Sequence, residues 1–321
     1  MLSTTPVHLP SPWTNVYGLA RTLLALGTLL TLAFSNSATL FRPVAFQGEH
    51  PTCRGVEAGG VFCLVPGDGL DATRWACVAV LLIVVSGWRP RLTALPHAYI
   101  SFSVFTGIAI GDGGDQMTTV LVLLLTLPAL GDSRRWHWST TDSATAHPRW
   151  LLLTGTSALV VARLQMSFVY FQACVSKLPH AEWADGTGMW YWGNSLGFRA
   201  PGWLHTLISP VLANPLGVAA LTWTPLFIEI SLAAALLVPQ RVRYALLTAG
   251  VGFHLSIAVM MGLWSFALAM GAGLLLLCLP LGGQLRLREP RADHESSGQQ
   301  ERSNAMVLDS EKPASRAAVT S

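Results

Sequence analysis

The sequence predicts an all-α integral membrane protein, a polytopic bundle of about eight transmembrane helices. Hydrophobic residues make up 51% of the 321-residue chain and charged residues 12%, a composition outside the range of soluble globular domains. Apolar runs recur with short polar breaks, and a helix needs roughly 20 such residues to cross a bilayer core of about 30 Å. The net charge of +3 is too small to indicate a nucleic-acid partner.

Eight apolar runs are the expected membrane spans. They cover residues 15–36, 74–88, 94–111, 116–131, 150–176, 214–238, 243–262 and 264–281. Most arginines follow the second, fourth, sixth and eighth runs, namely Arg89, Arg91, Arg134, Arg135, Arg149, Arg241, Arg243, Arg286, Arg288 and Arg291. Because cytoplasmic loops carry the excess of Lys and Arg, these segments are predicted to face the cytoplasm together with both termini.

The chain is expected to form one transmembrane domain, residues 1–281, followed by a tail. The first apolar run is too long for a signal peptide and no small-residue cleavage site stands out after it, so it is predicted to be retained. Residues 282–321 are polar and charged, which is typical of a disordered tail, here a cytoplasmic one. The sequence has no P-loop, HExxH or paired CxxC, which argues against an ATP-driven pump or a metalloprotease and predicts no metal site.

The loop at 37–73 is predicted to lie outside, and it contains Cys53 and Cys63. Oxidising exteriors permit disulfides and a separation of ten residues can close, so a bond between them is expected, with two free thiols as the alternative. The other three cysteines, Cys77, Cys174 and Cys278, fall in apolar runs and are predicted to be small buried hydrophobic residues.

Ionisable groups within a membrane are costly, by roughly 2.5 to 3.5 kcal/mol on insertion scales, so each is a candidate functional residue. The segment GDGGDQ holds Asp112, Asp115 and Gln116 between the third and fourth spans. Two carboxylates in a glycine-rich turn suit cation binding, recognition of an amine or acid–base chemistry. A plain solvated turn has the same composition.

The fifth span carries a polar face and ends at a lysine. Arg163, Ser167 and Tyr170 share one side of the helix, where they would either line a cavity or hold helices together. Lys177 lies at the mouth of this span. In the sixth span, the charge of Glu229 must be removed by protonation or paired with a cation such as Arg163.

Two further features point to the same predicted outer half. His254 lies in the seventh span, where it is either a hydrogen-bonded core residue or a functional one. The segment between the fifth and sixth spans is rich in aromatic residues, which indicates either an interfacial belt or a partly inserted cap over a cavity. They are Trp183, Trp190, Tyr191, Trp192 and Trp203.

The stretch VYFQACVSKLPHAEWADGTGMWYW, Val169–Trp192, resembles the corresponding segment of vitamin K-dependent gamma-glutamyl carboxylase and of the broader HTTM membrane-domain family. The shared elements are a Tyr-Phe, a Lys-Leu, and a Trp followed by an acidic residue and glycine. In the carboxylases the lysine of the Lys-Leu pair deprotonates a reduced quinone, so the resemblance implies that role for Lys177. Glu229 and the Phe253–His254 pair also look like that family, whereas Gln116 stands where the carboxylases have a functional histidine.

A bacterial branch of that group, the sporulation-delaying protein B family, is more similar still. The similar segments are Asn15–Asn36, the two-cysteine loop, GDGGDQ, and SRRWHW at Ser133–Trp138. Proteins of this branch are associated with maturation and production of a secreted antimicrobial peptide toxin. The resemblance therefore implies a multi-pass protein of the bacterial plasma membrane.

We therefore expect a protein that acts at the outer face in maturation of an exported peptide. Its partners would be membrane lipid, the peptide precursor and a small soluble protein. One alternative is a carboxylase-like enzyme that uses a reduced quinone with Lys177 as base, and another is a peptide transporter or immunity scaffold without chemistry. The expected catalytic residues are Lys177, His254, Asp112, Asp115 and Glu229, and the expected substrate-binding residues are Arg163, Tyr170, Gln116 and Trp183.

Overall fold

The computed structural model describes residues 9–45, 48–65, 67–139, 147–195 and 200–285. This part of the chain is helical and has two isolated β-bridges but no strand, so the predicted all-α class is confirmed. Residues 286–321, most of the predicted tail, lie outside the described residues.

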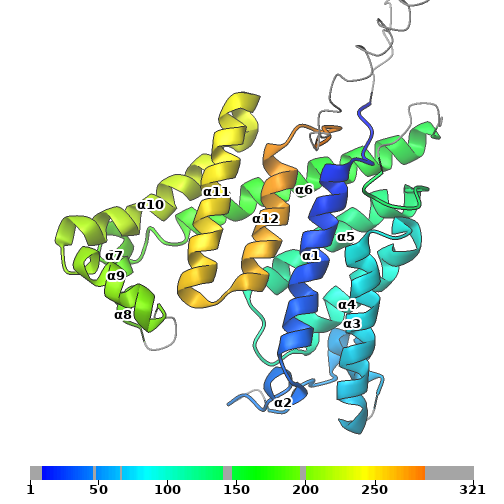
Figure 1. Ribbon diagram of the computed structural model, residues 1–321, viewed down its shortest axis with the longest axis horizontal. Helices are drawn as coiled ribbons and strands as arrows, with labels where there is room; N and C mark the ends of the chain where they lie inside the picture. The colour runs from blue at the N-terminus through cyan, green and yellow to red at the C-terminus, as the bar shows by residue number, and fades with distance from the viewer. Residues whose placement is uncertain (1–8, 46–47, 66, 140–146, 196–199, 286–321) are drawn as a thin grey trace, which may run out of the picture. The chain divides into compact units, whose positions relative to one another are not determined.

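Eight long helices match the eight predicted spans in order (Figure 1). They are α1 (Asn15–Phe34), α3 (Leu70–Ser86), α4 (Pro90–Gly107), α5 (Gly113–Gly131), α6 (Arg149–Val175), α10 (Pro215–Ala233), α11 (Gln240–Met261) and α12 (Trp264–Cys278). Six of them are long and apolar enough to cross a membrane, whereas α4 does not reach that hydropathy and α12 has 15 residues. The predicted count of eight is therefore approximate.

Short helical segments fill the connections. The short α-helices are α2 (Ser37–Leu40), α7 (Ala181–Ala184), α8 (Gly188–Asn194) and α9 (Gly202–Leu212). The 3-10 helices are η1 (Gly55–Gly59), η2 (Val61–Cys63), η3 (Gly67–Gly69) and η4 (Ala235–Leu237). Figure 1 shows α7, α8 and α9 gathered beside α10, and α8 and α9 both contact that helix.

Local chemistry fixes where the long helices begin and end. The side chain of Asp112 accepts hydrogen bonds from the first turn of α5 while Asp115 reaches back to the Asp112 amide, which forms a capping box. At the start of α10, the side chain of Asn214 accepts hydrogen bonds from the amides of Leu216 and Gly217. Gly87 and Gly262 end α3 and α11 with φ of 82° and 75°, a conformation that favours glycine.

Helix α12 lies at the centre of the bundle, where it contacts α1, α5, α6 and α11 (Figure 1). Small residues allow this close packing: a Cβ atom added to Gly273 would lie 2.4 Å from Cε of Met166 on α6. Helix α10 packs on α6 and α11 at the side of this group. Among the six candidate spans, α10 and α11 bury the least of their surface inside the protein.

Because successive long helices run in opposite directions, the connections gather at two ends. We call one the arginine end, formed by the α3–α4, α5–α6 and α10–α11 connections and the segment after α12. The opposite disulfide end holds the loop between α1 and α3, the α4–α5 turn, α7 to α9 and the α11–α12 turn. The membrane side that each end faces remains the prediction made from charge.

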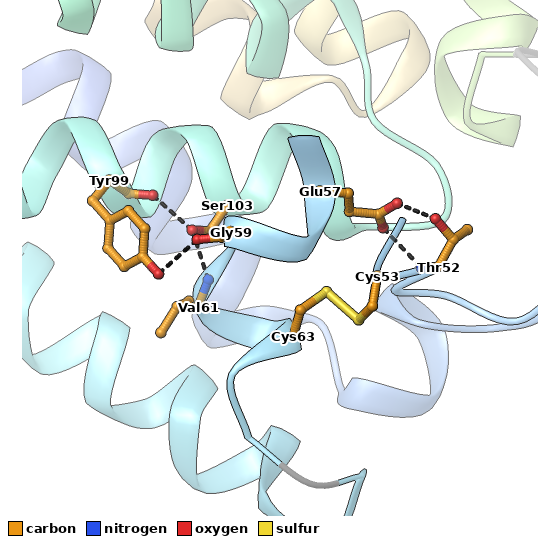
Figure 2. The surroundings of a disulfide bond; sticks show 8 residues. All are labelled: Thr52, Cys53, Glu57, Gly59, Val61, Cys63, Tyr99 and Ser103. Carbon is orange, nitrogen blue, oxygen red and sulfur yellow. Dashed lines mark hydrogen bonds between the residues drawn. A yellow bond between two sulfur atoms is a disulfide. The ribbon is translucent and has the colours of Figure 1, made fainter. Parts of the chain in front are cut away.

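The loop at the disulfide end is closed by a bond between Cys53 and Cys63, as predicted (Figure 2). Hydrogen bonds fasten the loop to α4. The hydroxyl of Tyr99 donates to the Gly59 carbonyl over 2.9 Å, and the Val61 amide donates to Oγ of Ser103 over 3.0 Å. The three remaining cysteines are buried and free, also as predicted.

The segment Ser133–Trp138, which we call the strap, crosses the arginine end. The His137 amide donates to the Gly87 carbonyl over 3.0 Å, and His137 Nε2 lies 3.1 Å from Oγ1 of Thr22 on α1. A Cβ atom on Gly18 would lie 2.8 Å from the His137 carbonyl oxygen, so glycine permits this close contact. The strap thereby joins α1 to the turn between α3 and α4.

Candidate functional site

Lys177 lies just beyond the end of α6 and folds back toward it. Its ammonium nitrogen Nζ lies 3.0 Å from the carbonyl oxygen of Ala173, one turn earlier. The same nitrogen lies 2.5 Å and 2.7 Å from the two carboxylate oxygens of Glu229 on α10. The ring centre of Trp183 on α7 is 5.4 Å from Nζ, within reach of a cation–π contact.

Glu229 is the counter-ion of this lysine, which corrects the sequence-based suggestion that Arg163 pairs with it. The Glu229 side chain is 6% exposed and the Lys177 side chain 24%. Arg163 instead donates to the carbonyl oxygens of Leu276 and Leu279, at the far end of α12. Arg163 lies near the middle of α6, whereas Lys177 follows the last residue of that helix, and Glu229 on α10 lies beside Lys177.

A cavity of about 740 Å³ opens beside the ion pair, within the range typical of small-molecule pockets. The end of α6, helices α7 to α11 and the start of α12 form its walls. Apolar groups dominate the lining, among them Trp183, Met189, Trp192, Leu221, Ile228, Phe253, Ile257, Met260 and Phe266. Lys177 and Glu229 are the charged groups in this lining. Of the five aromatic residues in the segment between the fifth and sixth predicted spans, Trp183 and Trp192 line this cavity.

Tyr170 and His254 form a second buried pair behind the cavity wall. The Tyr170 hydroxyl lies 2.9 Å from Nε2 of His254, and both residues are at most 3% exposed. Nδ1 of His254 has no hydrogen-bond partner among the described residues. The His254 ring packs edge-on against Phe266, with ring centres 5.4 Å apart, so it lies next to the cavity lining without being part of it.

The predicted polar face of α6 is present and holds three helices to it. Ser167 donates to the Ala233 carbonyl of α10 over 2.5 Å, and Cys174 donates to the Leu226 carbonyl of the same helix over 3.6 Å. Together with Arg163, Tyr170 and Lys177, these residues recur every three or four positions. Along most of its length, the polar face of α6 joins this helix to α10, α11 and α12. It reaches the cavity only at Lys177.

The turn GDGGDQ lies near the cavity but outside its lining. Asp112 and Asp115 are occupied by the capping box of α5, and Oγ of Ser265 donates to Asp112 over 3.4 Å. Gln116 is exposed. A Cβ atom on Gly114 would lie 2.5 Å from the Phe266 Cα atom, so the turn abuts the residue that contacts His254.

Apart from Trp183 and Trp192, sequence reasoning did not identify the apolar residues that line the cavity. Phe253, Met260 and Phe266 belong to runs that read as ordinary span residues, since an apolar side chain facing a cavity and one facing lipid have the same chemistry. Within the described residues, no group of three His, Cys, Asp or Glu side chains could hold a metal ion.

The pair has a definite chemical capacity. An ammonium group has three hydrogen-bond donors, and those of Lys177 point at three oxygens, so it offers no lone pair in this arrangement. Transfer of one proton to Glu229 would leave a neutral amine beside a neutral carboxyl group. Lys177 can therefore act as an acid in the charged state of the pair and as a base in the neutral state, with Glu229 in the opposite role, next to an apolar cavity.

Two proteins of Bacillus subtilis (strain 168) are similar to the chain over most of its length. The uncharacterized protein YitO is 35% identical over 278 residues, which cover 86% of this chain and 89% of YitO. The sporulation-delaying protein SdpB is 31% identical over 277 residues, which cover 84% of this chain and 83% of SdpB. The chain belongs to the SdpB family. No protein-family model and no solved structure matches it.

The SdpB family was the bacterial branch that the sequence resembled, so that part of the expectation is confirmed. The wider resemblance to HTTM proteins and to the carboxylase stays a prediction, because no family model supports it. Membership of the SdpB family together with six candidate spans identifies an integral membrane protein.

Proposed function

We propose that this protein takes part in the production of a secreted, toxin-like peptide and that it handles the peptide precursor in the cavity beside Lys177. The observation that carries the proposal is the ion pair of Lys177 and Glu229 in the wall of an apolar cavity of about 740 Å³, in a chain of the SdpB family. The name sporulation-delaying protein describes that relative by a biological effect. The resemblance of this chain to that branch supports a role in the production of a secreted peptide toxin.

The cavity suits an apolar segment of a peptide. Its aromatic and thioether side chains, such as Trp192 and Met260, offer contact area without charge. Helices α10 and α11 bury little of their surface inside the protein, so a segment already in the bilayer has a short route to the cavity. The apolar side chains of the lining would bind the peptide segment, and the ion pair of Lys177 and Glu229 would orient a polar group of the peptide backbone.

Lys177 and Glu229 are the proposed acid–base pair, and His254, bonded to Tyr170, is the proposed supporting group behind them. Removal of water by a bound apolar segment strengthens every electrostatic contact of the pair. A backbone carbonyl placed beside Nζ would then take the place of the Ala173 carbonyl as an acceptor for the ammonium form of Lys177. Asp112 and Asp115 are proposed to support the same wall through Phe266.

The proposed setting is the bacterial plasma membrane, with both termini in the cytoplasm and the disulfide end outside. The arginines of the opposite end and the bond between Cys53 and Cys63 support this orientation. Membrane lipid, the peptide precursor and a small soluble protein are the proposed partners.

Lys177→Ala tests the proposal in cells that make the peptide. We expect the mature peptide to disappear from the medium while the protein stays in the membrane at an unchanged level, measured by mass spectrometry and immunoblotting. The chain has one other lysine, Lys312, so Lys312→Ala is the matched control and should leave the peptide unchanged. Undiminished mature peptide from the Lys177→Ala strain would refute the role of this residue.

A quinone-dependent, carboxylase-like enzyme is the second candidate, because an apolar cavity beside Lys177 and Trp183 would also suit a quinone ring. It predicts that the peptide carries a covalent addition whose yield depends on quinone. A peptide altered only by cleavage or by disulfide formation excludes it. A transporter is less well supported, since the cavity is mainly apolar and its charged groups belong to the disulfide end.

A further inference from the structure

A second group of polar side chains is buried between α1 and α4, toward the arginine end. Tyr17 and Arg21 lie one turn apart on α1 and are each 1% exposed. His97 on α4 is 0% exposed. None of these residues lines the cavity beside Lys177, which the disulfide end forms.

These three side chains lack partners where partners are expected. Arg21 donates from Nη2 to Oγ1 of Thr93 over 3.0 Å, and Thr93 lies one turn before His97 on α4. Nη1 of Arg21, the Tyr17 hydroxyl and both ring nitrogens of His97 have no hydrogen-bond partner in the described part of the chain. Buried polar groups are paired in more than about nine cases in ten, so these exceptions, on two helices joined by the bond from Arg21 to Thr93, need an explanation.

The group also carries a positive charge that has no ion-pair partner in the described part of the chain. The ion pairs among the described residues join Arg74 to Asp71, Arg134 to Asp132 and Lys177 to Glu229, and Arg21 is in none of them. Arg134 occupies both carboxylate oxygens of Asp132. An isolated buried cation is strongly unfavourable, and arginine stays charged in proteins.

Arg21 is also the link between the other two groups. Through Thr93 it is bonded to the helix that carries His97, and it shares a helix face with Tyr17. The guanidinium, the phenol and one imidazole nitrogen all have hydrogens to donate, so donors outnumber acceptors in this group.

We propose that a small monovalent anion binds between Arg21, Tyr17 and His97 and joins α1 to α4. An anion accepts hydrogen bonds from all three side chains and neutralises the guanidinium, whereas water satisfies the donors but leaves the charge. The tight packing around the group favours an ion of the size of chloride or formate over phosphate. This site is separate from the proposed peptide cavity and does not depend on it.

Thermal unfolding of the purified full-length protein in detergent tests the proposal. The protein is prepared throughout in sodium gluconate, whose anion is too large for the site, and sodium chloride or sodium formate then replaces gluconate at constant ionic strength. We expect tryptophan fluorescence to show a saturable rise of about 2 to 4 °C in the unfolding temperature. The absence of a rise in the wild-type protein would mean that water alone fills the site and would overturn the proposal.

Arg21→Leu should remove the chloride response. Arg74→Leu is the matched control, because Arg74 is also buried but is satisfied by Asp71 and by the carbonyl oxygens of Leu32 and Ser35. It should lower the unfolding temperature and keep the chloride shift. An equal shift in Arg21→Leu and wild type, or loss of the shift in Arg74→Leu, contradicts the proposed site.

Tyr17→Phe provides the test if Arg21→Leu does not fold, because it removes only the hydroxyl oxygen and keeps the aromatic ring in place. Chloride binding is then followed by the line width of the ³⁵Cl nuclear resonance. Loss of one hydrogen bond to an anion should weaken chloride binding about tenfold. An unchanged chloride dissociation constant in this variant is the opposing result.

Discussion

The coupling energy between Lys177 and Glu229 can be measured with variants in which each residue is replaced by an apolar one of similar size, Lys177→Met and Glu229→Leu. At the observed 2.5 and 2.7 Å, two unit charges attract by about 6 kcal/mol for an effective dielectric constant of about 20. Desolvation offsets much of this attraction, but removal of one partner leaves the other buried alone. Each single variant should therefore lose about 3 kcal/mol of stability.

The double variant buries no charge at this place. It should also lose about 3 kcal/mol in place of the roughly 6 kcal/mol that independent effects would give, so the coupling energy is about 3 kcal/mol. Reversible unfolding in mixed micelles, followed by tryptophan fluorescence, measures all four proteins of the cycle.

A matched cycle of Lys177→Met with Glu57→Gln serves as the control. Glu57 accepts hydrogen bonds from Thr52 in the disulfide loop and shares no partner with Lys177. Its effect should add to that of Lys177→Met. Additive losses for Lys177 and Glu229 would show that the ion pair carries no coupling, and the assigned pairing would then be rejected.

Two further predictions concern the ends of the bundle. Replacing Cys53 and Cys63 with serine opens a ten-residue loop and should lower the free energy of unfolding by about 2 to 3 kcal/mol. The unfolding temperature of this variant should be below that of the oxidised wild-type protein and equal to that of the reduced wild-type protein. At the arginine end, burial and then the charges of Arg21 and Arg134 lower the pKa of His137 to about 3. In the unfolded chain this histidine has a pKa of about 6.5 and is protonated more readily than in the folded protein. The contribution of neutral His137 to the stability of the fold is therefore complete above about pH 6.5 and is lost as the pH falls toward 3. Unfolding temperatures measured across this range should fall less steeply for His137→Gln than for wild type, and parallel curves would show that another group is responsible.

Sequence patterns were sufficient for the helices because bilayer crossing imposes a length and composition on each of them. The order of the eight long helices and the polar face of α6 at Arg163, Ser167 and Tyr170 were all predicted. The bond between Cys53 and Cys63 followed from its compartment. Periodicity and compartment are local properties, so a single sequence carries them.

The partner of Glu229 was not predictable in this way. Arg163 lies on α6 and Lys177 follows directly after it, and the choice between them depends on how far α10 is shifted along α6. The cavity likewise depends on the separation of α10 and α11, which packing determines. Arg21 was missed for a different reason: it is a charge in the first apolar run, and the rule applied to Glu229 would have identified it.

The strap has a consequence for the order in which the protein is made. His137 contacts Gly87 and lies against Gly18 and Thr22, so every group that it joins belongs to the first 139 residues. A nascent chain that has emerged as far as Ser139 already contains the whole network. We therefore expect α1 to α5 to be fastened together at the arginine end before α6 has fully emerged, so that Lys177 and Glu229 are delivered to a platform that is already assembled.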